Sequence, residues 1–436
     1  MDIYTYIQQK DIRVTVIGLG YVGLPLAILA ATKGITTYGY DISTDRINQL
    51  RSGICYVDDV LSADVARFVE TETFIPTNDA SVIANSHVVI ICVPTPLTKH
   101  KIPDVSYITK AAETVGTYVQ KNTLVILEST TYPGTTEEVL VPLIEKHSGL
   151  ICGTDFFAAF APERVDPGNQ QFTFQQIPKV VGGISPEQTA VAVSFYRLLL
   201  DNVHPVSTTR VAEMTKLLEN IYRLVNISMI NEMALLCGKM DIDIWEVIEA
   251  AKTKPYGFQA FYPGPGAGGH CIPLDPFYLS WKAKEYDFQA RFIELAGDVN
   301  YRMPEYAMSK IMFALNQHKK ALNGSRILVL GVAYKRDIAD PRESPILRLL
   351  ELLMKKKAVV EFYDPHIELV HMEDEEHTQI SGKSSIQASD YASYDCVVIG
   401  TDHNAINYDD VVKHAPLIVD LRNAIKDRSH AHVYRF

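Results

Sequence analysis

The amino-terminal part of the chain alternates short apolar runs with glycine-containing turns and apolar stretches of helical length. The first run, Val14–Ile17, is β-branched and apolar, and the turn GLGYVG follows it. The stretch LPLAILAAT and a second run, ITTYGYD, come next. Short apolar runs that are bounded by turns and separated by helical segments are typical of buried parallel strands. The pattern therefore predicts a strand–helix–strand unit.

The same alternation continues further along the chain. The runs HVVIICVPTPL (87–97) and TLVILESTTYPGTT (123–136) are apolar at first and end in small polar residues and prolines. Residues 211–240 contain no proline and are apolar on more than one face, which predicts a long helix buried between domains. A further helical region is expected over residues 291–317.

After Asn323–Ser325 the alternating pattern restarts. RILVLGVAYK predicts a strand with a glycine turn, and AVVEFYDPH, DCVVIGTDH and LIVDLRN predict three more strands. Between the first two strands, Ser344 is the expected N-cap of a helix with Pro345 at its first position. The expected fold class is α/β, with two Rossmann-like doubly wound domains joined by a central helical domain that contains the long buried helix.

Composition narrows the function classes. The 436 residues include 47% hydrophobic and 21% charged positions, which is ordinary for a globular protein of two or three domains. The 41 basic and 52 acidic residues give a net charge of −11, which argues against nucleic acid or an anionic membrane as the partner. The six cysteines form no CxxC pair, so we expect no disulfide framework and no metal site, and a cytoplasmic location. No signal peptide or membrane span is expected.

The first glycine turn has the pattern of a dinucleotide-binding site. Gly18, Gly20 and Gly23 complete GxGxxG between a strand and a helix, and the second strand ends in Asp41. Such a turn lets pyrophosphate approach the backbone and the helix amino terminus, and the acid binds the adenosine ribose. The sequence therefore predicts an NAD site. Ligands of such folds lie at the carboxyl ends of the strands, so four residues there are expected to line its nicotinamide half: Val93, Thr95, Glu128 and Thr130. The incomplete glycine pattern of the second α/β domain predicts another nucleotide-like ligand, or none.

A stretch rich in glycine and proline surrounds one cysteine. In GPGAGGHCIPLD, Cys271 follows several glycines and precedes Asp275. The long helix offers Lys216 and Asn220, which are four residues apart and share one face. A thiolate there could add to an aldehyde, and the resulting adduct could lose a second hydride to give a thioester that water hydrolyses. The alternatives are a structural glycine loop around the cysteine and a Lys216 that only pairs with a neighbouring acid, Glu213 or Glu219.

Seven motifs in order make the chain resemble the UDP-glucose/GDP-mannose dehydrogenase family along nearly its whole length. They are VIGLGYVGLPLA, VPTPL, ESTTYPGTT, APERVDPG, AEMTKLLENIYRLVNISMINE, GPGAGGHCIPLDPFYL and GVAYKRDIADPRESP. The resemblance implies an NAD-binding domain (1–208), a central helical dimerisation domain with the catalytic residues (209–318) and a UDP-sugar-binding domain (319–436).

The resemblance also implies roles for single residues. Cys271 matches the family's nucleophile, and Lys216 and Asn220 match its oxyanion-stabilising pair. Asp275 matches the acid/base partner of the attacking water. Thr130 and Glu163 match positions that orient that water and the reacting sugar hydroxyl. The expected cofactor contacts are Gly18, Gly20, Tyr21, Val22, Gly23, Asp41, Arg46, Val93, Thr95, Thr130 and Arg342. The expected substrate contacts are Glu163, Arg164, Val165, Lys216, Asn220, Tyr262, Gly264, Gly266, Gly268, Gly269, Arg291 and Lys335.

Several positions depart from the UDP-glucose branch, and four stretches resemble bacterial UDP-N-acetylglucosamine 6-dehydrogenases: ESTTYPGTTEE, APERVDPGN, KPYGFQAFYPGPGAGGHCIPLDPFYLSWKA and RFIELAGDVN. The place of a second acid after Glu163 is taken by Pro167, with Asp166 before it, and Glu128 stands where relatives often carry lysine. His270 is expected to be a wall residue, because neighbouring side chains in extended backbone point apart. The implied function is NAD-dependent oxidation of the C6 alcohol of UDP-N-acetylglucosamine to the carboxylate, for O-antigen or capsule synthesis, by a homodimer or higher homo-oligomer.

Other functions remain open at this point. The same reaction on UDP-N-acetylgalactosamine, UDP-N-acetylmannosamine or UDP-glucose differs by a few hydroxyl contacts. A single-step 3-hydroxyacid dehydrogenase would need neither Cys271 nor the second α/β domain. A nucleotide-sugar-binding regulator would not need the four catalytic residue types.

Overall fold

The structure is a computed structural model of the whole chain, and it describes residues 3–9, 11–57, 60–98, 101–165, 174–372 and 378–436. Asp166 and Pro167, where the sequence departs from the UDP-glucose branch, lie outside the described residues. The chain forms two compact units, one of residues 1–219 and 277–288 and one of residues 220–276 and 289–436. Each unit is described by itself.

The first unit contains an eight-stranded sheet in the order β3-β2-β1-β4-β5-β6-β7-β8. The described pairs are parallel except β6 with β7, which are antiparallel. The order 3-2-1-4-5-6 is that of a doubly wound fold, which confirms the expected class. The strands are β1 (Arg13–Ile17), β2 (Thr36–Tyr40), β3 (Phe74–Thr77), β4 (Val88–Ile91), β5 (Leu124–Leu127), β6 (Phe157–Phe160), β7 (Lys179–Gly183) and β8 (Val203–Pro205).

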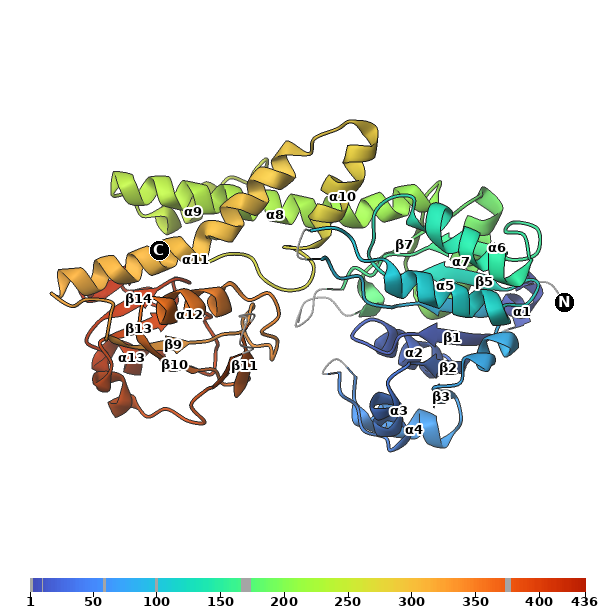
Figure 1. The fold of residues 1–436 in the computed structure, drawn as a ribbon, viewed down its shortest axis with the longest axis horizontal. Helices are drawn as coiled ribbons and strands as arrows, with labels where there is room; N and C mark the ends of the chain where they lie inside the picture. The colour runs from blue at the N-terminus through green and yellow to red at the C-terminus, as the bar shows by residue number, and fades with distance from the viewer. Residues whose placement is uncertain (1–2, 10, 58–59, 99–100, 166–173, 373–377) are drawn as a thin grey trace. The chain divides into compact units, whose positions relative to one another are not determined.

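Helices cover both faces of this sheet, as Figure 1 shows. Alternate side chains of one strand enter different cores: Val88 and Ile90 of β4 join one, and Val89 and Ile91 the other. Helices α1, α2 and α7 complete the first core, and α5 and α6 the second. Strands buried on both faces read as continuous apolar runs, which is why the sequence shows them clearly. The helices are α1 (Ile3–Gln9), α2 (Gly23–Thr32), α3 (Thr44–Arg51), α4 (Ser62–Glu70), α5 (Ser106–Tyr118), α6 (Val141–Ser148) and α7 (Pro186–Leu199).

The second α/β sheet has five parallel strands in the order β10-β9-β13-β14-β15. Helices α11 and α12 pack on one face and α13 on the other. Ser344 caps α12 by accepting a hydrogen bond from the Ile346 amide, as the sequence predicted. The elements are β9 (Arg326–Leu330), α12 (Pro345–Lys355), β10 (Val359–Tyr363), β13 (Cys396–Ile399), α13 (Tyr408–His414), β14 (Ile418–Asp420) and β15 (Val433–Arg435), with a hairpin of β11 (Leu369–His371) and β12 (Gln379–Ser381).

The central part of the chain is helical. It comprises α8 (Thr209–Met240), α9 (Ile244–Lys252), α10 (Asp275–Ala283) and α11 (Arg291–Gln317). Helix α8 is 32 residues long, and α11 has the bounds that the sequence predicted. None of the helices in the described part of the chain is long and apolar enough to cross a membrane.

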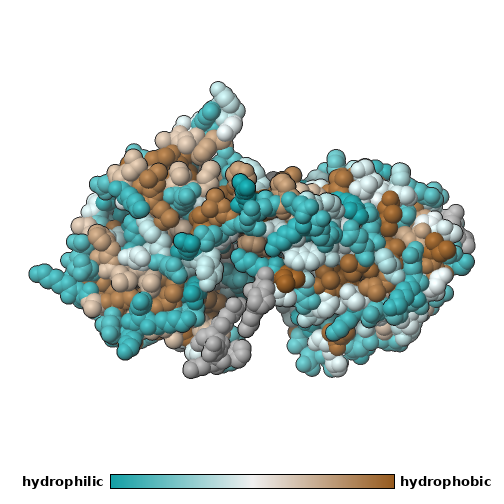
Figure 2. Space-filling model, turned by 45° about the horizontal axis from the view of Figure 1, so that its top comes forward, coloured by the Kyte–Doolittle hydropathy of each residue, from teal (hydrophilic) through white to brown (hydrophobic). Residues whose placement is uncertain are grey.

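Helix α8 is less buried than the sequence predicted. Large apolar side chains at helical spacing along it are exposed: Val211, Met214, Leu218, Tyr222, Met229, Met233, Leu236 and Met240. We call these eight side chains the α8 stripe. The expectation of a helix buried between domains is thus wrong for this face. The space-filling view in Figure 2 shows apolar patches, in brown, on an otherwise largely hydrophilic surface.

The close contact of α2 with the first glycine turn makes a test of the fold. A Cβ at Gly23 would lie 1.9 Å from the carbonyl oxygen of Gly18, whereas a Cβ at Gly20 would meet nothing within 4 Å. We expect Gly23→Ala to lower the free energy of unfolding by about 2–3 kcal/mol, because backbone cannot move aside cheaply. The matched control Gly20→Ala should change it by less than about 0.5 kcal/mol. Guanidinium titrations of both variants measure this, and equal effects would contradict the packing argument.

Candidate active site

The first glycine turn leaves room and hydrogen-bond donors for an anion. Gly18 has a φ of 88°, which only glycine adopts readily, and its amide donates to the Tyr40 carbonyl over 2.8 Å. The Gly20 backbone is open to approach. Helix α2 begins without a side-chain cap, so the amides of its first turn can face a phosphate. These features fit the pyrophosphate of a dinucleotide.

Asp41 lies at the carboxyl end of β2, beside this turn. Its Oδ2 accepts from the Leu19 amide over 2.9 Å and its Oδ1 from the Ser43 amide over 2.8 Å. Arg46 lies 3.5 Å from Oδ2, and its side chain is half exposed. The carboxylate is thereby fixed at the strand end, where the sequence placed the ribose contact. Two other predicted cofactor contacts, Tyr21 and Val22, belong to the same turn.

The segments after β4 and β5 are bonded to each other. The Ser129 hydroxyl donates to the Val93 carbonyl over 2.7 Å, and the Tyr278 hydroxyl of α10 donates to the Thr95 carbonyl. Thr130 follows Ser129 and is partly buried. The structure therefore brings Val93, Thr95 and Thr130 together at the carboxyl edge of the sheet.

A buried ammonium lies between two carboxylates at the same edge. The Nζ of Lys179, the first residue of β7, lies 2.9 Å from Oε2 of Glu128 and 3.0 Å from Oε2 of Glu163. The Tyr196 hydroxyl of α7 donates to Oε1 of Glu128. The side chains of Glu128, Lys179 and Glu163 are 0%, 5% and 13% exposed. The sequence did not single out Lys179, whose partners are distant along the chain.

The two carboxylates differ in their surroundings. Burial raises the pKa of Glu128, against the effect of Lys179. Burial would also raise the pKa of Glu163, but Lys179, the Val165 amide and Lys216 outweigh it and lower that pKa. Burial opposes and the two carboxylates favour the charged form of Lys179, so its pKa lies above the usual value. These surroundings favour the ionised form of Glu163 more than that of Glu128.

The residues after Glu163 are engaged within the unit. The amides of Arg164 and Val165 donate to Oε1 of Glu163 over 2.6 and 2.7 Å. The Arg164 guanidinium donates to Glu219 of α8 over 2.9 Å and to the Pro178 carbonyl over 2.7 Å. The side chain of Arg164 thus connects this loop to α8, and its contact with a substrate stays a prediction.

Helix α8 is anchored to the loop after β5 through Glu213. Its Oε2 accepts from the Gly134 amide over 2.6 Å, and its Oε1 from the amide and hydroxyl of Thr136 over 3.0 and 2.8 Å. The side chain is fully buried, and burial raises its pKa to about 7 against the effect of these donors. Close by in the chain, Arg210 pairs with Glu137 at 2.8 Å. These contacts fix α8 relative to the loop that carries Thr130.

Lys216 is not paired with the acids that the sequence offered as alternatives. Glu213 binds the loop at 134–136, and Glu219 binds Arg164. Lys216 is 7% exposed, and no hydrogen bond or ion pair of its ammonium occurs within the described residues. Its positive charge acts on Glu163. A buried cation that no group of the described residues binds is suited to an anionic group of a ligand.

In the second unit, two predicted catalytic residues are bonded to each other, and a third precedes one of them by one turn of the chain. The Nδ2 of Asn220 donates to Oδ2 of Asp275 over 2.6 Å, and the two residues are 4% and 2% exposed. The Asp275 amide donates to the Cys271 carbonyl over 2.9 Å, so the cysteine lies one turn before the start of α10. The Cys271 side chain is partly exposed. Burial and the nearby Arg342 lower the pKa of His270, which keeps this neighbour of the cysteine neutral.

The glycines of the loop 264–269 pack against the chain itself. A Cβ at Gly268 would lie 2.6 Å from the Glu343 carbonyl oxygen, and one at Gly269, whose φ is 83°, would lie 2.7 Å from the Tyr334 ring. A Cβ at Gly266 would lie 3.0 Å from Pro345. Packing against the second α/β domain is therefore a sufficient reason for residues without a side chain in this loop. Contact of these glycines with a substrate stays a prediction.

Arg422 is a candidate that the sequence analysis missed. It follows β14, and its guanidinium lies beside Gly264, where a Cβ would be 2.8 Å from Nη1. Its Nε donates to the Gly400 carbonyl over 2.9 Å. Burial and then Arg336 lower its pKa to about 10, and no carboxylate of the described chain forms an ion pair with it. An arginine at the end of the predicted strand LIVDLRN was the available signal for an anion contact.

In the second α/β domain, the carboxylate of Asp364 binds the backbone amides of the turn after β9. Oδ2 of Asp364 accepts from the amides of Val332 and Ala333 over 2.7 and 3.1 Å and lies 3.1 Å from Nε2 of His403. The Nδ1 of His403 accepts from the Asp337 amide over 3.0 Å. Donor atoms of Asp337, His366 and His403 lie within 4.8 Å of one another. Because both ring nitrogens of His403 are engaged, the cluster is not suited to hold a metal.

The remaining predicted contacts lie in the second unit. Arg342 makes a bidentate ion pair with Asp340, with distances of 2.9 and 2.6 Å, in the turn that precedes α12. Tyr262 donates to Glu249 over 2.8 Å and stacks on Trp245. Lys335 is partly buried in the turn after β9, and Arg291 is exposed at the start of α11. Their contacts with cofactor or substrate stay predictions.

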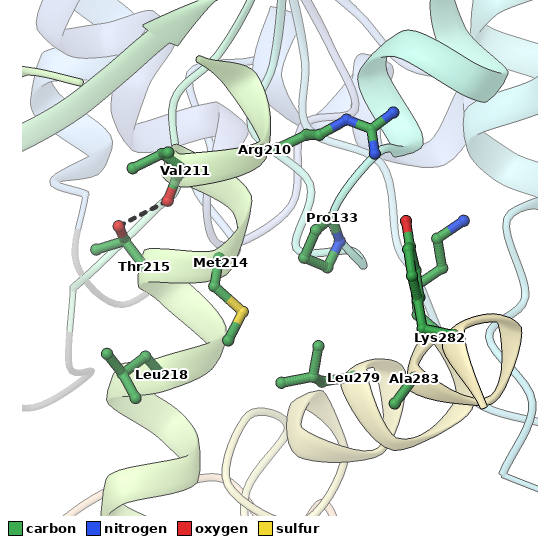
Figure 3. Close-up of a pocket in the computed structure, with 10 residues that line it drawn as sticks. Pro133, Arg210, Val211, Met214, Thr215, Leu218, Leu279, Lys282 and Ala283 are labelled. Atoms are coloured by element: carbon green, nitrogen blue, oxygen red, sulfur yellow. Dashed lines mark hydrogen bonds between the residues drawn. The ribbon is translucent and has the colours of Figure 1, made fainter. Parts of the chain in front are cut away.

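A separate open pocket of about 450 Å³ lies between α8, α10 and the loop at Pro133. Figure 3 shows Met214 of α8 pointing toward the space beside Leu279 of α10, with Pro133 above Leu279. The lining includes none of the predicted catalytic residues. It includes the first three members of the α8 stripe, Val211, Met214 and Leu218.

Comparison with known proteins identifies the family of the chain. Three family models match in order: the NAD-binding domain (12–200), the central domain (210–302) and the UDP-binding domain (328–427) of the UDP-glucose/GDP-mannose dehydrogenase family. The chain therefore belongs to this family. With its NAD-binding domain and its UDP-binding domain, it is an NAD-dependent UDP-sugar dehydrogenase.

Individual relatives cover almost the whole chain. The UDP-N-acetyl-D-glucosamine 6-dehydrogenase of Pseudomonas aeruginosa is 36% identical over 91% of this chain and 92% of its own. The UDP-N-acetyl-D-mannosamine dehydrogenase of Pyrococcus horikoshii is 35% identical over 97% and 98%. A solved structure of the UDP-D-ManNAc dehydrogenase from Pyrococcus horikoshii matches with a TM-score of 0.87 and 34% identity, over 97% of this chain and 98% of that one.

The buried Glu213 predicts a dependence of stability on pH. Its pKa, raised from 4.5 to about 7, means that the folded protein holds a proton that the unfolded chain releases. The contribution is fully present below pH 4.5 and is lost as the pH rises to about 7, and it amounts to about 3 kcal/mol. In Glu213→Gln, which does not titrate, the stability relative to wild type should therefore rise over this range. Denaturant unfolding at several pH values measures the difference, and a constant difference would show that the three donors keep Glu213 ionised.

Proposed function

We propose that the protein oxidises the C6 alcohol of UDP-N-acetylglucosamine to the carboxylate in two NAD-dependent steps. The observation that carries this proposal is the hydrogen bond from Asn220 to Asp275, one turn after Cys271. A dehydrogenase that removes a single hydride needs no thiol with a fixed carboxylate nearby. A thiol, a carboxylate and an amide in this arrangement suit an aldehyde that is captured and taken on to an acid.

The three family models support a division of functions among the domains, because they name an NAD-binding, a central and a UDP-binding domain. We assign NAD binding to residues 1–208, the catalytic groups and the dimer contact to residues 209–318, and UDP-sugar binding to residues 319–436, with Arg422 as an additional anion contact. NAD, when bound, accepts the hydride in each oxidation. The six cysteines are free thiols, which is in keeping with a cytoplasmic location.

The chain's own residues then perform the covalent step. The Cys271 thiolate adds to the C6 aldehyde, and the carbonyl electron pair moves to the oxygen, which the Lys216 ammonium and the Asn220 amide stabilise. Loss of the second hydride from this thiohemiacetal gives a thioester. Asp275 takes a proton from water, the water oxygen bonds to the carbonyl carbon, and the thiolate leaves. The product is the UDP-linked uronic acid, which serves surface polysaccharide synthesis such as O-antigen or capsule.

The substrate assignment rests on similarity, and the similar proteins differ in the UDP-sugar that their names give. The Pseudomonas aeruginosa relative acts on UDP-N-acetyl-D-glucosamine and the Pyrococcus horikoshii relative on UDP-N-acetyl-D-mannosamine, with 36% and 35% identity. We favour the glucosamine substrate because the loop motifs around Cys271 and Thr130 resemble that branch. UDP-N-acetylmannosamine, UDP-N-acetylgalactosamine and UDP-glucose are the alternatives.

The measurement that tests the proposal is the amount of NADH formed per UDP-sugar consumed. With the purified protein and each of the four UDP-sugars in turn, we expect two NADH per sugar, a carboxylate product and the fastest turnover with UDP-N-acetylglucosamine. Cys271→Ser should lower kcat by at least about 10³-fold and still bind the UDP-sugar, because the nucleophile is lost and the binding groups stay. One NADH per sugar with release of an aldehyde, or full activity of Cys271→Ser, would sink the covalent mechanism.

We also propose that a second copy of the chain covers the α8 stripe, giving a homodimer. The eight exposed apolar side chains repeat at helical spacing over the whole helix, and three of them line the open pocket of Figure 3. Exposed apolar side chains in a contiguous row are typical of protein–protein interfaces.

The dimer can be tested by adding a charge to the stripe. Met233→Glu combined with Leu236→Glu should produce monomers, because burial of two carboxylates in an apolar interface is unfavourable. Lys110→Glu, an exposed change on α5, is the control and should leave the oligomeric state as in wild type. Sedimentation velocity measures the mass of all three proteins. A wild-type monomer, or a double variant with unchanged mass, would contradict the proposal.

A further inference from the structure

The buried cluster of Glu128, Lys179 and Glu163 has a function beyond closing the sheet edge. We propose that Lys179 is a positioning residue for the dehydrogenase reaction, which keeps the Glu163 carboxylate ionised and fixed so that it accepts a hydrogen bond from the reacting hydroxyl or the attacking water. The inference rests on the proposed function, because it assigns Glu163 a role in that reaction.

The hydrogen bonds of Glu163 to the described residues leave one acceptor position of its carboxylate for a ligand. Its Oε1 is occupied by the amides of Arg164 and Val165, at 2.6 and 2.7 Å. Its Oε2 accepts from the Lys179 ammonium over 3.0 Å. A carboxylate oxygen can accept two hydrogen bonds, so Oε2 retains one position that no donor of the described residues occupies, and 13% of the side chain is exposed. A ligand hydroxyl can be bound there as a donor.

The position of the Lys179 ammonium is itself restricted by Glu128. The Glu128 oxygen Oε2 lies 2.9 Å from its ammonium, and Tyr196 fixes the other oxygen of Glu128. The side chain of Lys179 is only 5% exposed. An ammonium that is restricted in this way fixes the position of the Glu163 carboxylate. Its charge also offsets the desolvation of that carboxylate.

The charges around Glu163 make its ionised state depend on Lys179. The titratable groups that act on this cluster come from five elements or the turns that follow them: Glu128 after β5, Cys92 after β4, Lys179 of β7, Tyr196 of α7 and Lys216 of α8. Burial alone favours the protonated form of Glu163, and Lys179 is the largest opposing influence. Without Lys179 the carboxyl would hold its proton at a higher pH, and a protonated Glu163 cannot accept in the same way.

The test uses a variant that keeps the charge balance of the cluster. Lys179→Met alone would leave two carboxylates without a cation and could prevent folding. The double variant Glu128→Gln/Lys179→Met removes one acid and one base, so the net charge of the cluster is unchanged. Glu128→Gln alone is the matched control, because it retains the ion pair of Lys179 with Glu163.

The readout is the ratio of kcat/KM of the double variant to that of Glu128→Gln from pH 6 to pH 9, with the UDP-sugar that the wild type oxidises. Titration of Cys271 affects both proteins and cancels in the ratio. Because loss of Lys179 raises the pKa of Glu163, the ratio should be about tenfold lower at pH 6 than at pH 9. A ratio that is low but constant over this range would show a merely structural role and overturn the proposal.

A second readout does not depend on turnover. Adding Glu163→Gln to each protein and taking infrared difference spectra at pH 6 reports a protonated Glu163 carboxyl. The band should be present in the double variant and absent in Glu128→Gln. If the wild type oxidises no UDP-sugar, the proposed function fails, and this spectrum still decides whether Lys179 keeps Glu163 ionised. An absent band in the double variant would overturn the inference.

Discussion

Buried charge at the carboxyl ends of β5 and β6 is the constraint on which the candidate site depends. The doubly wound sheet is covered by helices on both faces, so groups at its edge are partly withdrawn from water. A carboxylate there is stable only with a cation or several donors. Lys179 meets this requirement for Glu128 and Glu163, with distances of 2.9 and 3.0 Å.

The same requirement is met differently where α8 joins the sheet. Glu213 has no cation and instead accepts from the Gly134 amide and from the amide and hydroxyl of Thr136. Glu213 binds the loop and Glu219 binds Arg164, so among the described residues neither of these acids of α8 pairs with the buried Lys216, whose charge remains for a ligand. The contacts that stabilise α8 therefore also decide which of its charged residues is available for chemistry.

Much of the fold could be predicted from the sequence because its signals are local. A strand buried on both faces is a continuous apolar run, and the strand, GxGxxG turn, helix and second strand that end in Asp41 form a complete unit of about 30 residues. The bounds of α11 and the cap at Ser344 followed from the same kind of local pattern. The exposure of the α8 stripe could not be predicted from the sequence. The spacing of apolar residues on a helix is the same whether they face the core of their own chain or another chain.

By itself, the sequence determined the α/β class, the dinucleotide turn, and the residue types Cys271, Lys216, Asn220 and Asp275, because each depends on spacing along one segment. The tertiary structure decided what pairs with what. It placed Lys179 between Glu128 and Glu163, engaged Glu213 and Glu219 away from Lys216, and set Arg422 beside Gly264. These partners are far apart in the chain, and only the folded backbone brings their side chains within hydrogen-bond distance.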